Sequence, residues 1–187
     1  PYALAVASLE PRKNFSRLLD AWDQLPADLR EAHQLVVVVS AEWLQGAVRR
    51  RLAKMGRSGS VLMLDHVPAP ELAALYRGAR TLVFPSLAEG FGLPVAEAMA
   101  CGAPVVTSDR SSMPEVADGA AVLVDPEDVS SIAEGIERVL ADQGLRRDLR
   151  ERGFESASRF TAEAVVPKLI EVYGRTAKRA RVGLRHV

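Results

Sequence analysis

The sequence predicts one α/β domain, a doubly wound, Rossmann-like parallel sheet of six strands with helices on both faces. Short apolar runs alternate with longer segments whose apolar residues recur at spacings of three and four, as in amphipathic helices. Residues 35–39 are apolar throughout, which is typical of a strand buried on both faces. The six predicted strands are residues 3–8, 35–39, 61–64, 81–84, the run after Gly102 and residues 120–124.

Helices in the first half follow from apolar spacing and capping residues. Asn14 ends a polar turn and is a suitable N-cap for a helix at residues 15–24. A second helix is expected at residues 42–54, followed by a loop at residues 55–59. A third, shorter helix is expected at residues 71–77.

The second half repeats this alternation. Pro94 opens a short helix, and Asp128 caps a helix that runs to about residue 140. Two further helices are expected at residues 145–158 and 162–179.

Composition limits the class of protein. The 187 residues suffice for one core, and 48% hydrophobic and 26% charged residues are usual for a soluble chain. No apolar run approaches the roughly 20 residues of a membrane span. The 24 basic and 24 acidic residues balance, so the chain has no net positive charge that would attract nucleic acid. The single cysteine, Cys101, has apolar neighbours, which indicates a structural thiol in a reducing compartment. With no signal peptide pattern at the start, we expect a cytoplasmic protein.

The stretch from residue 84 to residue 108 organises the chain. It leads from a strand through the loop Glu89-Gly90-Phe91-Gly92 into a short helix, and the free N–H groups and macrodipole there suit a phosphate or hydroxyl groups. Glu97 lies about one turn into this helix, whose other members are apolar. We therefore expect Glu97 to be a buried carboxylate that needs a partner.

Arg12 and Lys13 follow the first strand, and in a doubly wound sheet this turn opens at the same edge as the glycine loop. Two cations that face a helix N-terminus predict a diphosphate ligand. The alternative is a pair of solvated turn residues. Glu89 is alternatively an exposed loop acid, and Glu97 an internal partner of one of the cations.

Other classes of site have no support in the sequence. The glycine loop lacks the third glycine of a dinucleotide fingerprint, because Val95 stands in its place. His33, His66 and His186 have no metal-ligand spacing, so we expect no metal site, and His66 is expected at the surface. No serine-hydrolase elbow or Walker loop occurs.

Residues 10–14 (Glu-Pro-Arg-Lys-Asn) and 84–106 closely resemble the C-terminal, donor-binding domain of retaining family 4 (group 1) glycosyltransferases of the GT-B fold. Glu89 and Glu97 match the E-x7-E pattern of that family. The likeness covers nearly the whole chain and continues through residues 111–116, 123–126 and 145–147. It implies that residues 1–160 form a nucleotide-sugar (donor) binding domain and that residues 161–187, a C-terminal helix and basic tail, pack toward an N-terminal acceptor domain.

The resemblance also implies roles for individual residues. Lys13, with Arg12, would bind the diphosphate of a UDP-, GDP- or ADP-sugar, and Glu97 would hold the ribose hydroxyls. Glu89 would contact the transferred hexose, so Glu89, Lys13 and Arg12 are the expected catalytic residues. The family needs no cofactor or divalent metal, and its acceptor is a glycan or a lipid-linked molecule. The donor site would be completed by Ser8, the backbone near Val67 beside the base, and the loop residues Gly90, Phe91, Gly92 and Leu93.

Three positions depart from the family pattern. Ala7, Val39 and Asp65 stand where glycine is usual, and each adds a side chain where backbone often approaches a ligand. The acceptor domain itself is expected outside this chain. A rival interpretation is therefore a non-catalytic nucleotide-binding or protein-docking module of the same fold.

The tail is locally basic and allows two interpretations. It is either a solvated end or a peripheral contact with anionic membrane at the inner face, near a lipid-linked acceptor. Its cations are Arg175, Lys178, Arg179, Arg181 and Arg185.

Overall fold

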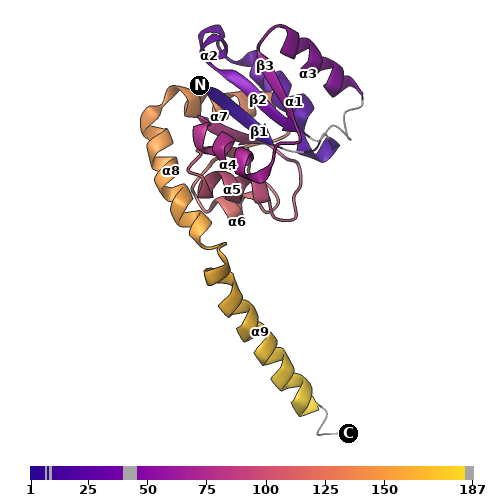
Figure 1. Ribbon diagram of the computed structural model, residues 1–187, viewed down its shortest axis with the longest axis vertical. Helices are drawn as coiled ribbons and strands as arrows, with labels where there is room; N and C mark the ends of the chain where they lie inside the picture. Colours follow the sequence, from indigo (N-terminus) through magenta and orange to yellow (C-terminus); the bar gives the residue numbers. More distant parts are fainter. Residues whose placement is uncertain (7, 9, 40–45, 184–187) are drawn as a thin grey trace.

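The computed structural model of this chain describes residues 1–6, 8, 10–39 and 46–183, with side chains described through residue 176. A six-stranded, all-parallel sheet has the strand order β3-β2-β1-β4-β5-β6 (Figure 1), which confirms the predicted fold class. The strands are β1 (Tyr2–Val6), β2 (Gln34–Val39), β3 (Val61–Asp65), β4 (Thr81–Phe84), β5 (Val105–Ser108) and β6 (Val122–Val124).

The strand order reverses between β1 and β4. The chain passes outward from β1 through β2 to β3, and then returns to place β4 on the other side of β1. Ala3 of β1 is paired with Leu35 on one side and with Thr81 on the other. In doubly wound sheets the loops that follow the strands at such a reversal leave a crevice between them. The loops after β1 and β4 therefore border the ligand crevice expected of this fold.

Helices cover both faces of the sheet (Figure 1). One face packs against α1, α3 and α7, and the opposite face packs against α4, α5 and α6. The helix α8 contributes Leu149 to the first layer and Ala157 to the second, so it closes one side of the domain. The helices are α1 (Phe15–Gln24), α2 (Ala27–Ala32), α3 (Ala47–Arg57), α4 (Ala69–Gly78), α5 (Leu93–Ala100), α6 (Met113–Ala117), α7 (Val129–Ala141), α8 (Gln143–Ser158) and α9 (Ala162–Gly183).

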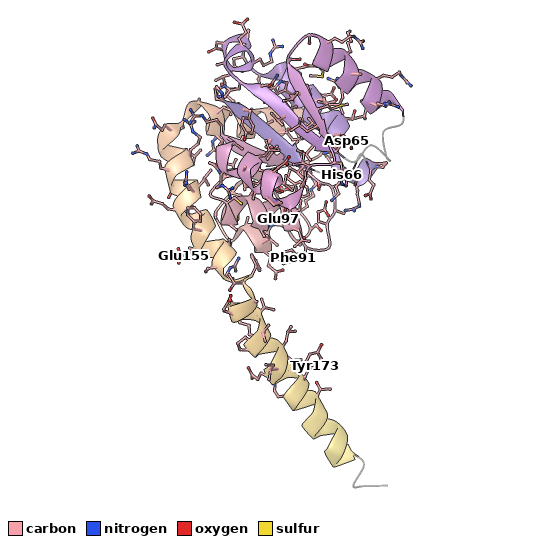
Figure 2. All side chains as sticks on the ribbon, in the orientation of Figure 1. Asp65, His66, Phe91, Glu97, Glu155 and Tyr173 are labelled. Carbon is pink, nitrogen blue, oxygen red and sulfur yellow. The ribbon has the colours of Figure 1, made fainter. Side chains whose placement is uncertain are left out.

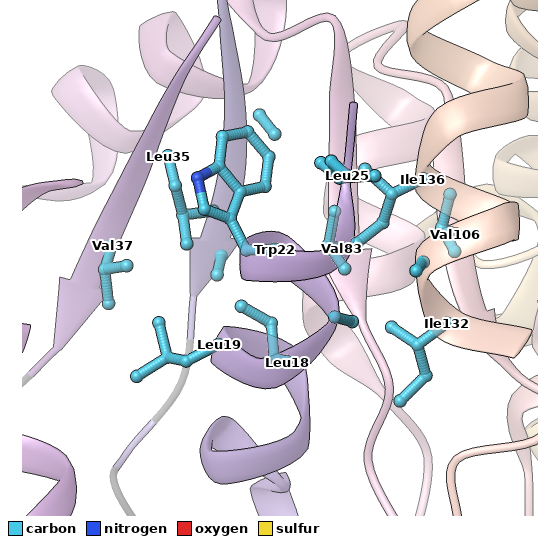
Figure 3. Close-up of a cluster of buried hydrophobic side chains, with 14 of the residues drawn as sticks. Leu18, Leu19, Trp22, Leu25, Leu35, Val37, Val83, Val106, Ile132 and Ile136 are labelled. Atoms are coloured by element: carbon cyan, nitrogen blue, oxygen red, sulfur yellow. The ribbon is translucent and has the colours of Figure 1, made fainter. Parts of the chain in front are cut away.

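The core between α1, α7 and the sheet centres on Trp22, which is fully buried. Figure 3 shows Leu18 and Trp22 of α1 near Val83 of β4, with Ile132 of α7 on the side of Val83 away from Trp22. Burying an isoleucine or leucine side chain contributes roughly 1.5–3 kcal/mol. This layer therefore anchors β1 and β4, the two strands that carry the crevice loops.

Several element boundaries differ from the sequence prediction. β1 ends at Val6 instead of residue 8, and α3 continues through Arg57, where the pattern predicts a loop from residue 55. Met55 is 8% exposed and belongs to the core, so its packing extends the helix. The start predicted at residue 42 lies outside the described residues.

Two short helices, α2 and α6, are missing from the prediction. They have six and five residues, too few for a periodic pattern to stand out. By contrast, the predicted cap of α7 is confirmed, because the Asp128 side chain accepts a 2.9 Å hydrogen bond from the Ser130 amide.

The helix α9 projects away from the domain (Figure 1) and continues past residue 179, its predicted end. No described helix is long and apolar enough to cross a membrane. The division of the chain at residue 160, the packing of α9 on an acceptor domain and the role of the basic tail stay predictions. Among the tail cations, Lys178, Arg179, Arg181 and Arg185 have side chains outside the described part of the chain. Several apolar side chains of α9 are exposed, namely Val166, Leu169, Ile170, Val172 and Tyr173.

Candidate functional site

The loops after β1 and β4 meet at the carboxyl ends of the strands, beside the reversal of strand order. The first contains the 3-10 helix η1 (Pro11–Lys13), and the second leads to Gly92, where α5 begins. The Leu87 amide donates a 2.8 Å hydrogen bond to the Arg12 carbonyl. The predicted meeting of the Arg12-Lys13 turn with the glycine loop is therefore present.

Asn14 holds three loops of this edge together. It stands at the predicted N-cap position of α1, but its backbone is left-handed (φ 62°) and its side chain makes no capping bond. Its amide instead donates to the carbonyls of Pro85 (3.0 Å) and Pro126 (2.6 Å), in the loops after β4 and β6. Asn14 is therefore the N-cap of α1 as predicted, but its side chain does not cap the helix. Its Oδ1, the atom that a capping bond would use, accepts a 3.1 Å hydrogen bond from Arg17 Nη1 instead.

Glu89 lies between the two predicted phosphate-binding cations. Its Oε1 accepts a 2.6 Å hydrogen bond from Lys13 Nζ, and its Oε2 accepts a 2.8 Å bond from Arg12 Nη1. The side chains of Lys13 and Glu89 are only 11% and 8% exposed, whereas that of Arg12 is 44% exposed. The solvated-turn alternative is wrong for Lys13, and the exposed-acid alternative is wrong for Glu89.

Glu10 extends this network and is a residue that the sequence analysis missed. Ser8 Oγ donates to Glu10 Oε1 at 2.5 Å, and Arg12 Nε donates to Glu10 Oε2 at 2.9 Å. These bonds, first from Ser8 and then from Arg12, lower the pKa of the Glu10 carboxyl. Hydrogen bonds to Glu10 and then Glu89 raise the pKa of Arg12. The predicted donor residue Ser8 therefore joins the site through Glu10, whose place two residues before Arg12 was the available signal.

Glu97 differs from its prediction. It is exposed, not buried, because it lies on the outer side of α5 toward α4 (Figure 2). The Tyr76 hydroxyl donates a 3.1 Å hydrogen bond to Glu97 Oε2. Burial, followed by the charge of Glu97, raises the pKa of Tyr76. No ion pair joins Glu97 to Arg12 or Lys13 in the described structure, so the internal-partner alternative is wrong.

Two serines in the loop after β5 brace the glycine loop. The Ser111 hydroxyl donates to the Glu89 carbonyl (2.7 Å) and accepts from the Glu89 amide (3.1 Å). The Ser112 hydroxyl lies within hydrogen-bonding distance of the Glu89 carbonyl (3.1 Å) and the Phe91 carbonyl (2.9 Å). Their position after the neighbouring strand was a signal that sequence reasoning did not use for site residues.

The remaining loop residues turn toward α5 and the end of α8. Gly92 has a φ of 97°, and an added Cβ would lie 2.2 Å from Met113 Cε, so this position favours glycine. Phe91 is labelled in Figure 2 near the junction of α8 and α9, where its ring meets that of Phe160 edge to face at 5.0 Å. Gly90 and Leu93 are exposed, so this backbone is accessible to a ligand.

Comparison with known proteins assigns the family. The profile of the family described as glycosyl transferases group 1 matches residues 1–156 of this chain. The chain belongs to the group 1 glycosyltransferases. O-antigen chain mannosyltransferase B of Escherichia coli is 38% identical over 172 residues, which cover 92% of this chain and 45% of that protein.

Two further relatives agree with this assignment. The serotype-specific mannosyltransferase WbdA of Escherichia coli is 36% identical over 86% of this chain and 20% of its own length. Sucrose-phosphate synthase from Thermosynechococcus elongatus has a structure with a TM-score of 0.82 and 30% identity, covering 96% of this chain and 46% of that chain. The fold is thus one half of a GT-B glycosyltransferase, and the chain spans less than half the length of each of these relatives.

The positions that depart from the glycosyltransferase pattern lie in different surroundings. Val39 is 2% exposed and packs in the core, so its side chain does not reach the crevice as expected. Asp65 ends β3, two strands away from β1, and Val67 is partly buried beside it. Ala7 lies outside the described residues. The described residues include no group of three or more His, Cys, Asp or Glu side chains that could hold a metal ion.

Proposed function

We propose that this chain is the donor-binding half of a retaining glycosyltransferase that transfers a hexose from a nucleoside diphosphate. The observation that carries the proposal is the meeting of Arg12, Lys13 and Glu89 beside the start of α5, at the point where the strand order reverses. The names of the two mannosyltransferase relatives support mannose as the sugar and a growing glycan as the acceptor.

In this proposal Arg12 and Lys13 neutralise the diphosphate, which carries the negative charge when the bond to the sugar breaks. Charge-assisted hydrogen bonds from such cations are roughly twice as strong as neutral ones. The Glu89 carboxylate accepts hydrogen bonds from both cations and so holds them side by side. A bound diphosphate would take over these cations and leave Glu89 free to face the hexose.

The nucleoside end of the donor is assigned to the outer side of α5. The exposed Glu97 carboxylate accepts the ribose hydroxyls, while Tyr76 fixes its Oε2 from the side of α4. The serines 111 and 112 hold the backbone of residues 89–91, so that loop amides and the helix N-terminus stay aligned with the phosphate.

Sugar transfer is proposed to need the acceptor domain as well. Holding two reactants in near-attack geometry accounts for roughly 7–11 kcal/mol of barrier lowering, and one half of a GT-B enzyme offers only one wall of the cleft. We therefore propose that this chain binds donor nucleotide but transfers no sugar, even with Lys13, Glu89 and Glu97 in place. Slow hydrolysis of the donor is the most activity expected.

Titration of the chain with UDP, GDP and ADP tests the binding claim. Saturable binding of one nucleotide supports the donor-binding half and identifies the base. Absence of binding to all three would favour the rival interpretation, a non-catalytic docking module. A radiolabelled-donor assay tests the second claim, because robust transfer by the chain alone would mean that it holds a complete active site.

A further inference from the structure

A small cavity lies at the edge of the sheet opposite the crevice. It is lined by residues that precede β4 and β5 and by the first turns of α8, and its volume is about 150 Å³. Drug-sized ligands occupy pockets of roughly 300–1,000 Å³, so this cavity admits a smaller group. Four arginines line it, namely Arg80, Arg146, Arg147 and Arg150.

Within the described residues, none of these four arginines forms an ion pair with a carboxylate. Within the described part of the chain, the guanidinium groups of Arg80 and Arg147 take part in no ion pair or hydrogen bond. Arg150 lies over the ring of Phe154, 5.6 Å from its centre. Arg146 donates to the last carbonyls of α7, those of Val139 and Leu140, at 2.7 and 2.6 Å. The backbone thus anchors one cation, while the others keep their donors for a ligand.

The local charge is strongly positive. Burial, followed by the charge of Arg80, lowers the pKa of Arg146, and the nearby Asp142 opposes this shift. Asp142 is also engaged as the cap of α8, where its Oδ1 accepts from the Leu145 amide at 2.9 Å. One carboxylate offsets only part of the four positive charges, and the N-terminus of α8 adds a partial positive charge of its own.

A second cavity contains an arginine that is paired with carboxylates. It has a volume of about 630 Å³, lies between α1, α2 and α3, and includes Arg51. Arg51 is bonded to Asp20 at 2.5 Å and to Asp23 at 2.7 Å. Within the described residues, the arginines of the smaller cavity have no such pairing. Arg146 is partly buried, whereas Arg80, Arg147 and Arg150 are exposed, so their guanidinium groups are open to a ligand.

We propose that Arg80, Arg146, Arg147 and Arg150 form a site for a phosphoryl group, separate from the donor crevice. The guanidinium fork matches phosphate oxygens in pairs, so arginine is the residue suited to this ligand. A soluble phosphate or pyrophosphate and the headgroup of an anionic lipid offer the same chemistry. The site does not depend on the proposed transferase activity, because none of its residues lies in the crevice.

The test uses the double variant Arg80→Ala/Arg147→Ala. Neither side chain has a partner among the described residues, so the fold should survive, and thermal melting checks this. Calorimetric titration with pyrophosphate measures binding of a soluble phosphate ligand. Sedimentation with phosphatidylglycerol vesicles measures binding of a lipid headgroup, and phosphatidylcholine vesicles are its control. We expect saturable binding in at least one arm, weakened ten-fold or more by the double variant.

Two controls distinguish this site from the donor crevice and from a general effect of positive charge. Arg50→Ala/Arg57→Ala removes the same charge from exposed positions of α3 and should leave the binding unchanged. Lys13→Ala removes the pyrophosphate binding expected in the donor crevice, so the titrations are also run in the Lys13→Ala variant, where the remaining binding should still be weakened by Arg80→Ala/Arg147→Ala. The proposal is overturned if neither arm shows binding, if the α3 control weakens it equally, or if Lys13→Ala abolishes it while the double variant does not.

Discussion

Lys13 Nζ and Glu89 Oε1 lie 2.6 Å apart, and both side chains are about nine-tenths buried. They lie in separate loops, and the resemblance to the family assigns them to different parts of one donor molecule. In the structure they are bonded to each other. In the proposed function, donor binding replaces this carboxylate with a phosphate as the partner of Lys13, and mutations of either residue measure the competition between the two anions.

Replacing Lys13 with alanine should weaken binding of the nucleoside diphosphate by ten-fold or more, because a bond to a charged group contributes roughly 1.5–3 kcal/mol. The bare nucleoside should bind as before. Added salt should narrow the difference between the two ligands. Calorimetric titration of both ligands measures this, and equal weakening of both would remove Lys13 from the phosphate site.

Glu89→Gln should have the opposite effect on the nucleoside diphosphate. The glutamine keeps the size of the side chain but removes a negative charge that competes for Arg12 and Lys13. Two unit charges 4 Å apart interact by roughly 1 kcal/mol in water and more strongly in a partly buried site, so the dissociation constant should fall by about five-fold. The nucleotide sugar should lose affinity relative to the diphosphate. A weaker diphosphate complex would show that Glu89 assists the cations instead of competing with them.

Glu97→Ala should reduce nucleotide affinity by about ten-fold, because the ribose hydroxyls lose a charged acceptor. Since Glu97 is exposed, the melting temperature should change little. Tyr76→Phe is the matched control, because it removes only the hydroxyl that bonds to Glu97 Oε2. We expect a smaller loss of affinity from this control. The wild type should bind a 2′-deoxynucleotide more weakly than the matching ribonucleotide. The Glu97→Ala variant should bind the two nucleotides with equal affinity.

Asn14→Ala should destabilise the fold without touching a ligand-binding side chain. It leaves the buried carbonyls of Pro85 and Pro126 without their donor, at a cost of roughly 1–3 kcal/mol each. Asn14→Gly loses the same bonds but tolerates the left-handed backbone, which costs other residues roughly 1–2 kcal/mol. Urea unfolding should therefore rank wild type above Asn14→Gly and Asn14→Gly above Asn14→Ala. Equal values for the two variants would mean that backbone strain is not at work here.

Cys101 should react slowly with iodoacetamide. Burial raises the pKa of its thiol, Arg77 opposes the shift and Glu97 adds to it. The reactive species is the thiolate, so at pH 7 the folded chain should be alkylated more slowly than free cysteine, by roughly ten-fold for each unit by which the pKa is raised. The difference should disappear in urea. Alkylation as fast as that of free cysteine in the folded chain would indicate an activated thiol.

Local sequence determined much of the fold and the location of the site. Apolar runs predict the strands because buried parallel strands need apolar side chains on both faces, and Asp128 caps α7 as predicted because its partner is only two residues away. The Arg12-Lys13 turn and the glycine loop could be placed at one crevice, since parallel strands bring the loops after them to one edge of the sheet.

Only the tertiary structure decided how those side chains pair. The exposure of Glu97 depends on how α5 packs against α4. The pairing of Glu89 with Lys13 depends on how closely their two loops approach each other, although the two residues are 76 positions apart in the sequence. The side-chain amide of Asn14 bonds to two carbonyls that are distant in sequence, which the local capping pattern does not anticipate. Hydrogen bonds and ion pairs depend on distances of about 3 Å. Sequence spacing does not give such distances across a sheet. The sequence therefore predicts which residues meet but not which bonds they form.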